Sequence, residues 1–179
     1  VVLDASVGSY VQGLPDSWAA ISVRRLLTHT SGLPDYGRVI RDWDRPQSRE
    51  LIINAIGTAP LLFAPGTAWA YSNTNYVVLG WLIEALSGQS YADYLRHRVL
   101  GPAALPSARV DSAGDVIPDR AEPYDHINNR FVNAVQLERS VSAAADGGVL
   151  FSARDIAPWS TALAGERLVS RMLMSEATK

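Results

Sequence analysis

The clearest pattern of apolar and polar positions lies in the middle of the chain, where apolar residues recur every three or four positions and stop before Gly88. These positions are Val77, Val78, Trp81, Leu82 and Leu86. A spacing close to 3.6 residues places them on one side of a helix, so we predict a helix over 74–87. Ser90 is a suitable N-cap and Gly101-Pro102 a suitable end for a second helix. The short connection predicts that the two helices form a helical hairpin.

Weaker patterns predict four more helices and one irregular region. We expect a short helix from Ser22 to about His29 with Gly32 as its stop, a helix over 47–57, one beginning at Ser152, and one over 168–178. From 103 to 146, glycine, proline, aspartate and asparagine interrupt the pattern. That region predicts small strands or long loops.

Length and composition describe one ordinary globular domain. The chain has 179 residues, of which 47% are apolar and 19% charged, and its formal net charge is -2. We therefore expect no nucleic-acid partner, because nucleic acids select a concentrated basic face. No apolar run reaches the roughly 18 residues of a membrane span, so none is expected. Localisation stays open between a periplasmic or extracellular and a cytoplasmic site.

The sequence lacks the residues and motifs on which several kinds of chemistry depend. There is no cysteine, and the three histidines, His29, His97 and His126, are too far apart in sequence to pair on one helix face. We therefore expect no metal and no cofactor. Fifteen of the sixteen basic residues are arginine, and the one lysine is Lys179. Motifs such as G-x-S-x-G and G-x-x-x-x-G-K-[ST] are also absent.

Three blocks of sequence resemble the serine β-lactamase-like family, which holds class C β-lactamases, D-alanyl-D-alanine carboxypeptidases and related esterases. They are ISVRRLLTHTSGLPDY at 21–36, FAPGTAWAYSNTNYVVLGWLIEALSGQSYADYLRHRVLGPAAL at 63–105, and SAAADGGVLFSARDIAPW at 142–159. Together they span nearly the whole chain in the family's order. The resemblance implies an α+β fold that is predominantly α here: the helical domain with a few short strands, and with the large antiparallel sheet largely missing.

The resemblance also implies site residues. The family uses Ser-x-x-Lys, Tyr-x-Asn and Lys/His-Thr/Ser-Gly motifs, in which a base activates the serine and amide groups orient the acyl substrate. Tyr71 matches the proton-transfer tyrosine and Asn73 the substrate-orienting asparagine. Ser72, Tyr36 and Trp69 are the candidate substrate-binding residues, and Trp43 is a further candidate for the substrate entrance.

The other two motifs are absent from this sequence. No serine is followed three residues later by lysine, and no Lys-Thr-Gly or His-Thr-Gly occurs. In the family the nucleophile precedes the LLTHTSG block and the strand motif follows the GGVLFS block. We therefore expect residues 1–179 to be one domain that is a fragment of a larger hydrolase.

The same residues also allow plainer interpretations. Asn73 can simply be the N-cap of a helix that begins at Thr74. The LLTHTSG stretch can simply end a helix, with His29 near the helix dipole and Gly32 in the left-handed conformation. A Ser31-His29-Asp35 triad is conceivable, but residues so close in one loop rarely converge in triad geometry.

The sequence therefore predicts a serine acyl hydrolase acting on a β-lactam, a D-Ala-D-Ala peptide or a small ester, with this chain alone inactive. The alternatives are a non-catalytic binding or partner module of the same fold, and a split enzyme completed by another chain. A surface that met a missing sheet would be apolar, so self-association is expected for a short form.

Overall fold

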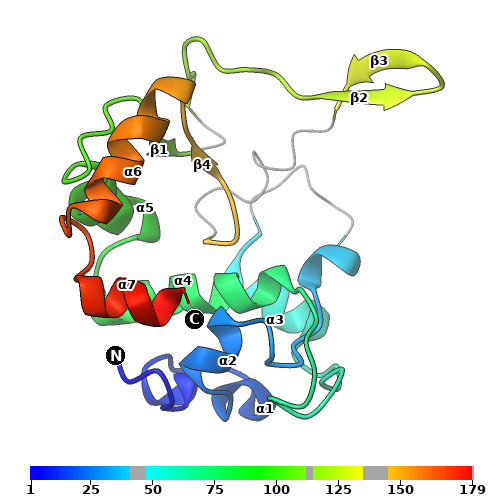
Figure 1. Ribbon diagram of the computed structural model, residues 1–179. Coiled ribbons are helices and arrows are strands. Elements are labelled where there is room, and N and C mark those ends of the chain that lie inside the picture. The colour runs from blue at the N-terminus through cyan, green and yellow to red at the C-terminus, as the bar shows by residue number, and fades with distance from the viewer. Residues whose placement is uncertain (41–46, 112–114, 135–144, 179) are drawn as a thin grey trace.

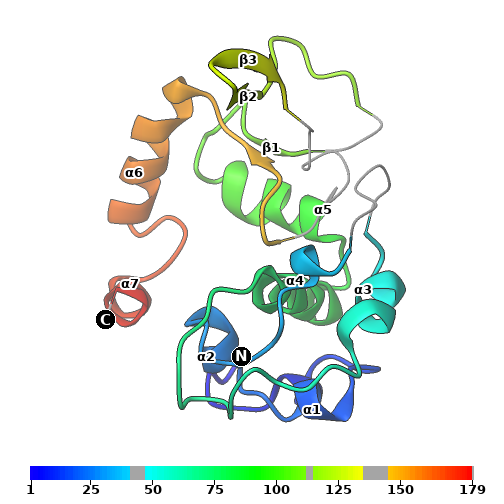
Figure 2. The ribbon, with the colours of Figure 1, turned by 90° about the vertical axis from the view of Figure 1, so that its right-hand side faces the viewer.

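The arrangement of helices follows from one central helix, α4 (Asn73–Ser87), against which the N-terminal third of the chain packs. The computed structural model describes residues 1–40, 47–111, 115–134 and 145–178. In Figure 1, α4 crosses the middle of the molecule with α1 and α2 below it. Figure 2 shows α5 on the opposite side of α4 from α1 and α2.

The described part of the N-terminal third contains only short helices, because turn residues interrupt each apolar run. They are η1 (Val7–Ser9), α1 (Asp16–Ala19), α2 (Val23–Leu27), η2 (Tyr36–Arg38) and α3 (Arg49–Ile56). The predicted helices at Ser22 and at 47–57 correspond to α2 and α3. Ser48 caps α3, because its side chain accepts a hydrogen bond from the backbone N–H of Leu51.

The main hydrophobic core lies between these helices and α4. Its most deeply buried members come from distant parts of the chain: Val7, Trp18, Leu26, Leu33, Ile52 and Val78. The predicted helix over 74–87 is confirmed, and it ends at Gly88, whose φ of 67° is left-handed. One predicted core position differs, because Leu86 is exposed.

The second predicted helix is also present, and it consists of an α-helical part followed by a π-helical part. Ser90 caps α5 (Tyr91–Leu95), and the chain continues through one turn of π-helix, η3 (Arg96–Leu100). α5 packs against α4, which gives the predicted helical hairpin. A smaller apolar cluster lies beyond it, formed by Leu100, Ala103, Leu105 and Ala162.

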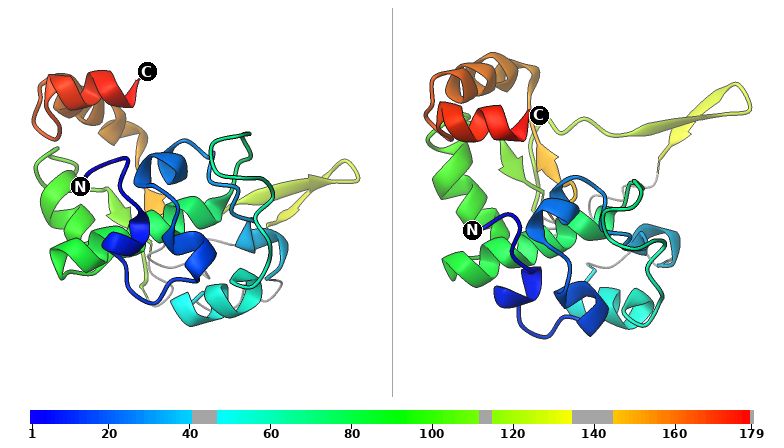
Figure 3. Two further views of the ribbon diagram at one scale, coloured as in Figure 1. Left: turned by 90° about the horizontal axis from the view of Figure 1, so that it is seen from below. Right: turned by 60° about the horizontal axis from the view of Figure 1, so that its bottom comes forward.

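The strands in the described part of the chain form two small antiparallel sheets. β1 (Arg109–Val110) pairs with β4 (Val149–Leu150), and β2 (Tyr124–Ile127) pairs with β3 (Arg130–Asn133). The turn between β2 and β3 is Asn128-Asn129, both with positive φ, as a two-residue type I′ turn requires. Every residue of β2 and β3 is exposed, and the hairpin extends away from the helices in Figure 3.

The C-terminal part returns to helix. The segment that begins at Ser152 forms η5 (Ala153–Asp155) and α6 (Ile156–Ala164), and the predicted final stretch forms α7 (Arg171–Ala177). The fold is therefore predominantly α with a few short strands, as predicted. Among the described residues no helix is long and apolar enough to cross a membrane.

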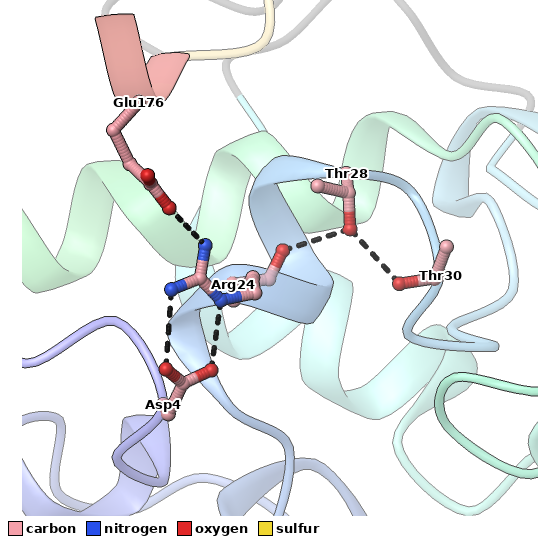
Figure 4. Close-up of polar contacts among 5 residues, drawn as sticks. All are labelled: Asp4, Arg24, Thr28, Thr30 and Glu176. Carbon is pink, nitrogen blue, oxygen red and sulfur yellow. Dashed lines mark hydrogen bonds and ion pairs between the residues drawn. The ribbon is translucent and has the colours of Figure 1, made fainter. Parts of the chain in front are cut away.

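One arginine connects the first and last parts of the described chain. Arg24 in α2 donates through Nε and Nη2 to the carboxylate of Asp4, at 2.8 and 3.1 Å, and through Nη1 to Glu176 in α7 at 2.9 Å. Figure 4 shows both contacts. In the same view, Thr28 donates to the carbonyl oxygen of Arg24, and its hydroxyl lies 2.9 Å from that of Thr30. α2 is thus the point where the two ends of the chain meet.

Candidate active site

The candidate site lies where an extended segment, residues 67–72, enters α4. The helix begins at Asn73, and the N-cap position belongs to Ser72, whose side chain makes no capping hydrogen bond. The interpretation of Asn73 as an N-cap before Thr74 is therefore wrong. Because Asn73 is the first helical residue and not the cap, its amide side chain is available for contacts outside the helix.

Tyr71 and Asn73 are in direct contact. The hydroxyl of Tyr71 donates to Oδ1 of Asn73 at 2.9 Å. The amide Nδ2 of Asn73 lies 3.2 Å from Oδ2 and 3.4 Å from Oδ1 of Asp35. Asp35 is held in turn by the backbone N–H of Gly37 at 3.0 Å. The chain of contacts fixes which end of the Asn73 amide faces Tyr71.

Aromatic side chains surround the Tyr71 ring. The imidazole of His29 lies 4.6 Å from the Tyr71 ring, 5.2 Å from the Tyr76 ring and 6.3 Å from the Trp69 ring, centre to centre. Trp69 and Tyr71 are 65% and 53% exposed. Of the predicted site residues, these two are therefore the ones most accessible to a ligand.

A buried polar network lies beneath this exposed rim. Asn75 is fully buried; its Oδ1 accepts from the hydroxyl of Ser31 at 2.5 Å, and its Nδ2 lies 3.0 Å from Nδ1 of His29. Ser31 accepts from the backbone N–H of Leu33 at 3.0 Å. Thr74, also buried, donates to the carbonyl oxygen of Pro34. The network connects the loop after α2 to the first turn of α4.

Two predicted substrate-binding residues are enclosed by the protein. Ser72 is fully buried, and its hydroxyl has no hydrogen-bond partner among the described residues. Tyr36 is 2% exposed, and its hydroxyl donates to Oδ2 of Asp146 at 2.7 Å. Both side chains therefore support the site from within, because neither presents a surface to a ligand. Trp43 lies outside the described residues.

Burial shifts the proton equilibria of three groups near the site. It raises the pKa of the Tyr36 hydroxyl, and the neighbouring Asp146 carboxylate raises it further. It also raises the pKa of Asp146, against the opposing effect of the hydrogen bond from Tyr36. For His29, burial lowers the pKa from 6.5. Each shift favours the neutral form of its group.

The LLTHTSG stretch does more than end α2. The helix ends at Leu27, and His29 itself takes the left-handed conformation with a φ of 55°. Gly32, predicted to be left-handed, has a φ of 80°, and a Cβ there would lie 2.3 Å from the carbonyl oxygen of Phe63. Only glycine permits that approach.

A Ser31-His29-Asp35 triad is not formed. The hydroxyl of Ser31 donates to Asn75, and Asp35 contacts Asn73. Nδ1 of His29 faces the backbone N–H of Ser72 and the side-chain amide of Asn75. All three residues nevertheless lie in the polar network around Tyr71 and Asn73. Sequence reasoning placed His29 at a helix end and Ser31 and Asp35 in the loop that follows it. Pro34, which interrupts a helix, marked that loop but did not show that it reaches α4.

The arrangement can orient an acyl group and move a proton, through the amide of Asn73 and the hydroxyl of Tyr71. Among the described residues, no group of three or more histidine, aspartate or glutamate side chains could hold a metal ion. A phenol beside an asparagine amide, at the start of a buried helix, is the combination expected for the Tyr-x-Asn part of a serine hydrolase of the β-lactamase type.

The comparisons with known proteins agree with that class. The Beta-lactamase family model matches residues 1–179, and the chain belongs to that family. It is 36% identical over 126 residues to penicillin-binding protein 4* of Bacillus subtilis (strain 168), covering 66% of this chain and 27% of that protein. It is 33% identical over 127 residues to a D-aminopeptidase of Brucella canis, covering 67% of this chain and 23% of that protein.

A solved structure shows the same fold. The penicillin-binding protein from Bacillus halodurans matches with a TM-score of 0.81 and 21% identity, over 98% of this chain and 56% of that one. The chain thus spans about half the length of that structure and about a quarter of the length of the two relatives.

Proposed function

We propose that this chain contributes the tyrosine and asparagine part of the active site of a serine acyl hydrolase that acts on a β-lactam, a D-amino-acid peptide or amide, or a small ester. The observation that carries the proposal is the 2.9 Å hydrogen bond between Tyr71 and Asn73 beside an exposed rim. In this scheme Tyr71 exchanges a proton with the serine nucleophile, and Asn73 orients the substrate amide.

The names of the relatives support the substrate class. One is a penicillin-binding protein and the other a D-aminopeptidase, so both names refer to an amide-containing compound. Trp69 is the best candidate for a substrate contact, because its exposed ring lies two residues before Tyr71 and contacts the same imidazole. An aromatic ring in that position can pack against an apolar substituent of a substrate.

The chain by itself is proposed to be inactive. The sequence contains no Ser-x-x-Lys motif and has one lysine, Lys179. Loss of the nucleophile lowers the turnover of a serine hydrolase by a factor on the order of a million. Tyr71 and Asn73 alone supply no covalent intermediate and no oxyanion hole.

Intact-mass spectrometry tests the proposal. The purified 179-residue chain, of 19.4 kDa, is incubated with benzylpenicillin or with a D-phenylalanine amide, and no covalent adduct is expected. The species produced in the native cells is isolated with an antibody raised against the exposed hairpin 124–133, and it is expected to be larger or to carry a second chain and to form an acyl adduct on a serine.

Paired variants of the native species distinguish the roles. Tyr71→Phe should lower the acylation rate by on the order of a hundredfold or more, while Tyr94→Phe, a tyrosine of α5, should leave it unchanged. A native species of 19.4 kDa that forms no adduct would instead support a non-catalytic module of the same fold.

A further inference from the structure

His29 holds the segment on both sides of Tyr71. Its carbonyl oxygen accepts from the backbone N–H of Ala70 at 3.1 Å, and its Nδ1 faces the backbone N–H of Ser72 at 3.3 Å. The same nitrogen lies 3.0 Å from Nδ2 of Asn75. A single residue in the loop after α2 therefore contacts the chain at three places: before Tyr71, directly after Tyr71, and in the first turn of α4.

The polar network determines the protonation state of Nδ1. Ser31 accepts from Leu33 and gives its own proton to Oδ1 of Asn75. The other end of that amide is an NH2 group, so it can only donate to His29. The backbone N–H of Ser72 is a donor as well. Two donors converge on Nδ1, so this nitrogen is an acceptor and the neutral ring carries its proton on Nε2.

The ring also forms one wall of the space that Tyr71 occupies. The His29 and Tyr71 rings are 4.6 Å apart with a 34° angle between their planes, and the Tyr76 ring contacts the imidazole at 5.2 Å. Tyr76 is itself fixed by its hydroxyl, which donates to the carbonyl oxygen of Leu27 at 3.2 Å. The imidazole therefore restricts the Tyr71 ring while its Nδ1 holds the adjoining backbone.

We propose that His29 is a positioning residue for Tyr71 and Asn73, acting as a neutral hydrogen-bond acceptor that fixes the entry into α4. As a statement about catalysis this inference rests on the proposed function. Its structural content does not, because the hydrogen bonds exist in this chain whether or not a nucleophile is present.

Nitrogen NMR of the 179-residue chain gives the first test. Long-range proton–nitrogen spectra at pH 7.5 should show His29 as the neutral tautomer with the proton on Nε2, and His97 and His126 serve as internal references. A proton on Nδ1 of His29 would overturn the proposal. The spectrum needs only the unaltered protein, so it decides the question even if a variant fails to fold.

Amide hydrogen exchange in two matched variants gives the second test. His29→Asn keeps an acceptor near the Nδ1 position and tolerates a positive φ, so the Ser72 amide should keep its protection to within about threefold of the unaltered chain. His29→Phe keeps an aromatic ring but has no acceptor, and protection of the Ser72 amide should fall at least tenfold. Equal protection in both variants would contradict the proposal.

Acylation of the native species separates this inference from the proposed function. If His29→Phe slows adduct formation at least tenfold, and His29→Asn restores most of the rate, the positioning role extends to catalysis. If the unaltered native species forms no adduct while the NMR and exchange results hold, the proposed function fails and the structural role of His29 stands. If the native species reacts and both variants react equally fast, the positioning role in catalysis is wrong.

Discussion

At the scale of single residues, the site depends on neutral polar groups held in a partly buried setting. Burial lowers the pKa of His29 from 6.5, and the titratable groups whose rings contact it are Tyr71 and Tyr76. Because the native state favours the neutral imidazole, the unfolded chain binds more protons below the ordinary pKa of histidine. The contribution of His29 to stability is therefore present above that pKa and is lost as the pH falls toward the lowered, native value.

We predict a matching change in the pH dependence of unfolding. Urea unfolding is measured from about pH 7.5 to about pH 5, a range that brackets the ordinary histidine pKa. The free energy of unfolding of the unaltered chain should fall as the pH is lowered, and it should fall less in His29→Asn. His126→Asn, in the exposed hairpin, should behave like the unaltered chain. Parallel pH curves for all three proteins would contradict the prediction.

A second residue-scale prediction concerns the buried Tyr36 and its partly buried partner Asp146. Tyr36→Phe removes the donor to Oδ2 of Asp146, whose Oδ1 has no partner among the described residues. We expect a loss of about 1–3 kcal/mol in the free energy of unfolding at pH 7, the cost of leaving a buried acceptor unsatisfied. Thermal and urea unfolding measure it.

Asp146→Asn provides the comparison. Since the pKa of Asp146 is raised from 3.8, its contribution to stability is present below that value and is lost as the pH rises through the native pKa. The asparagine variant lacks this loss. Its free energy of unfolding should therefore increase relative to that of the unaltered chain as the pH rises from about 4 to about 7. A difference between the two proteins that shrinks over this range would contradict the raised pKa of Asp146.

Residue-level sequence reasoning predicted some of the side chains that meet here. The motif positions Tyr71 and Asn73 are in contact, and Trp69 is exposed beside them. The roles predicted for other residues differ from their positions in the structure, because the sequence does not show which side of a loop faces the core. Ser72 and Tyr36 were expected to meet a ligand and are enclosed, whereas Asp35 and His29, expected in a loop or a helix end, hold the site together.

At the scale of elements, α4 can be predicted because its apolar residues recur at helical spacing over many positions. The segments that pack against α4 cannot be predicted in this way. The glycine at position 80 shows why. A Cβ on Gly80 would lie 2.8 Å from Cβ of Ala145, the residue just before Asp146. The close packing of a late loop on the middle of α4 depends on two small residues, Gly80 and Ala145. No local pattern in either segment predicts that they meet.

We therefore predict strong coupling between Gly80 and Ala145. Gly80→Ala alone should destabilise the chain, because the clash outweighs the roughly 0.5–1 kcal/mol that alanine gains over glycine inside a helix. In an Ala145→Gly background the same change should stabilise it by about that amount. A double-mutant cycle of unfolding free energies should give a coupling of about 0.5–3 kcal/mol.

Ala85→Gly on the exposed face of α4 is the control for that cycle. It should cost about 1 kcal/mol in either background, because it touches neither partner. Additive effects of Gly80→Ala and Ala145→Gly would show that the late loop does not pack on α4 as described.

At the scale of the whole molecule, a partly exposed arginine connects the first and last parts of the described chain. No residue of α7 is buried, and Arg24 connects this helix to Asp4 through ion pairs whose side chains are 37% (Arg24 and Glu176) and 71% (Asp4) exposed. Exposed ion pairs contribute little to stability, and salt weakens them further. The attachment of α7 should therefore be easier to break than the core.

Arg24→Gln tests that attachment. Hydrogen exchange of the α7 amides, followed by mass spectrometry, should be several-fold faster than in the unaltered chain, while the global free energy of unfolding changes little. High salt should speed exchange in the unaltered chain but not in the variant. Asp93→Asn, which breaks the exposed pair with Arg96, should leave α7 unchanged. Unaltered α7 exchange in Arg24→Gln would show that other contacts hold the helix.

The hairpin of β2 and β3 has a consequence for how the chain folds. Its pairing joins residues at most nine positions apart in sequence, from Tyr124 to Asn133, and it buries no side chain in the cores. A hairpin of this kind closes on a timescale of about 1–10 μs and is at best marginally stable alone. It can therefore form and open many times while the helices around α4 assemble, so its kinetics are independent of the rate-limiting step of folding.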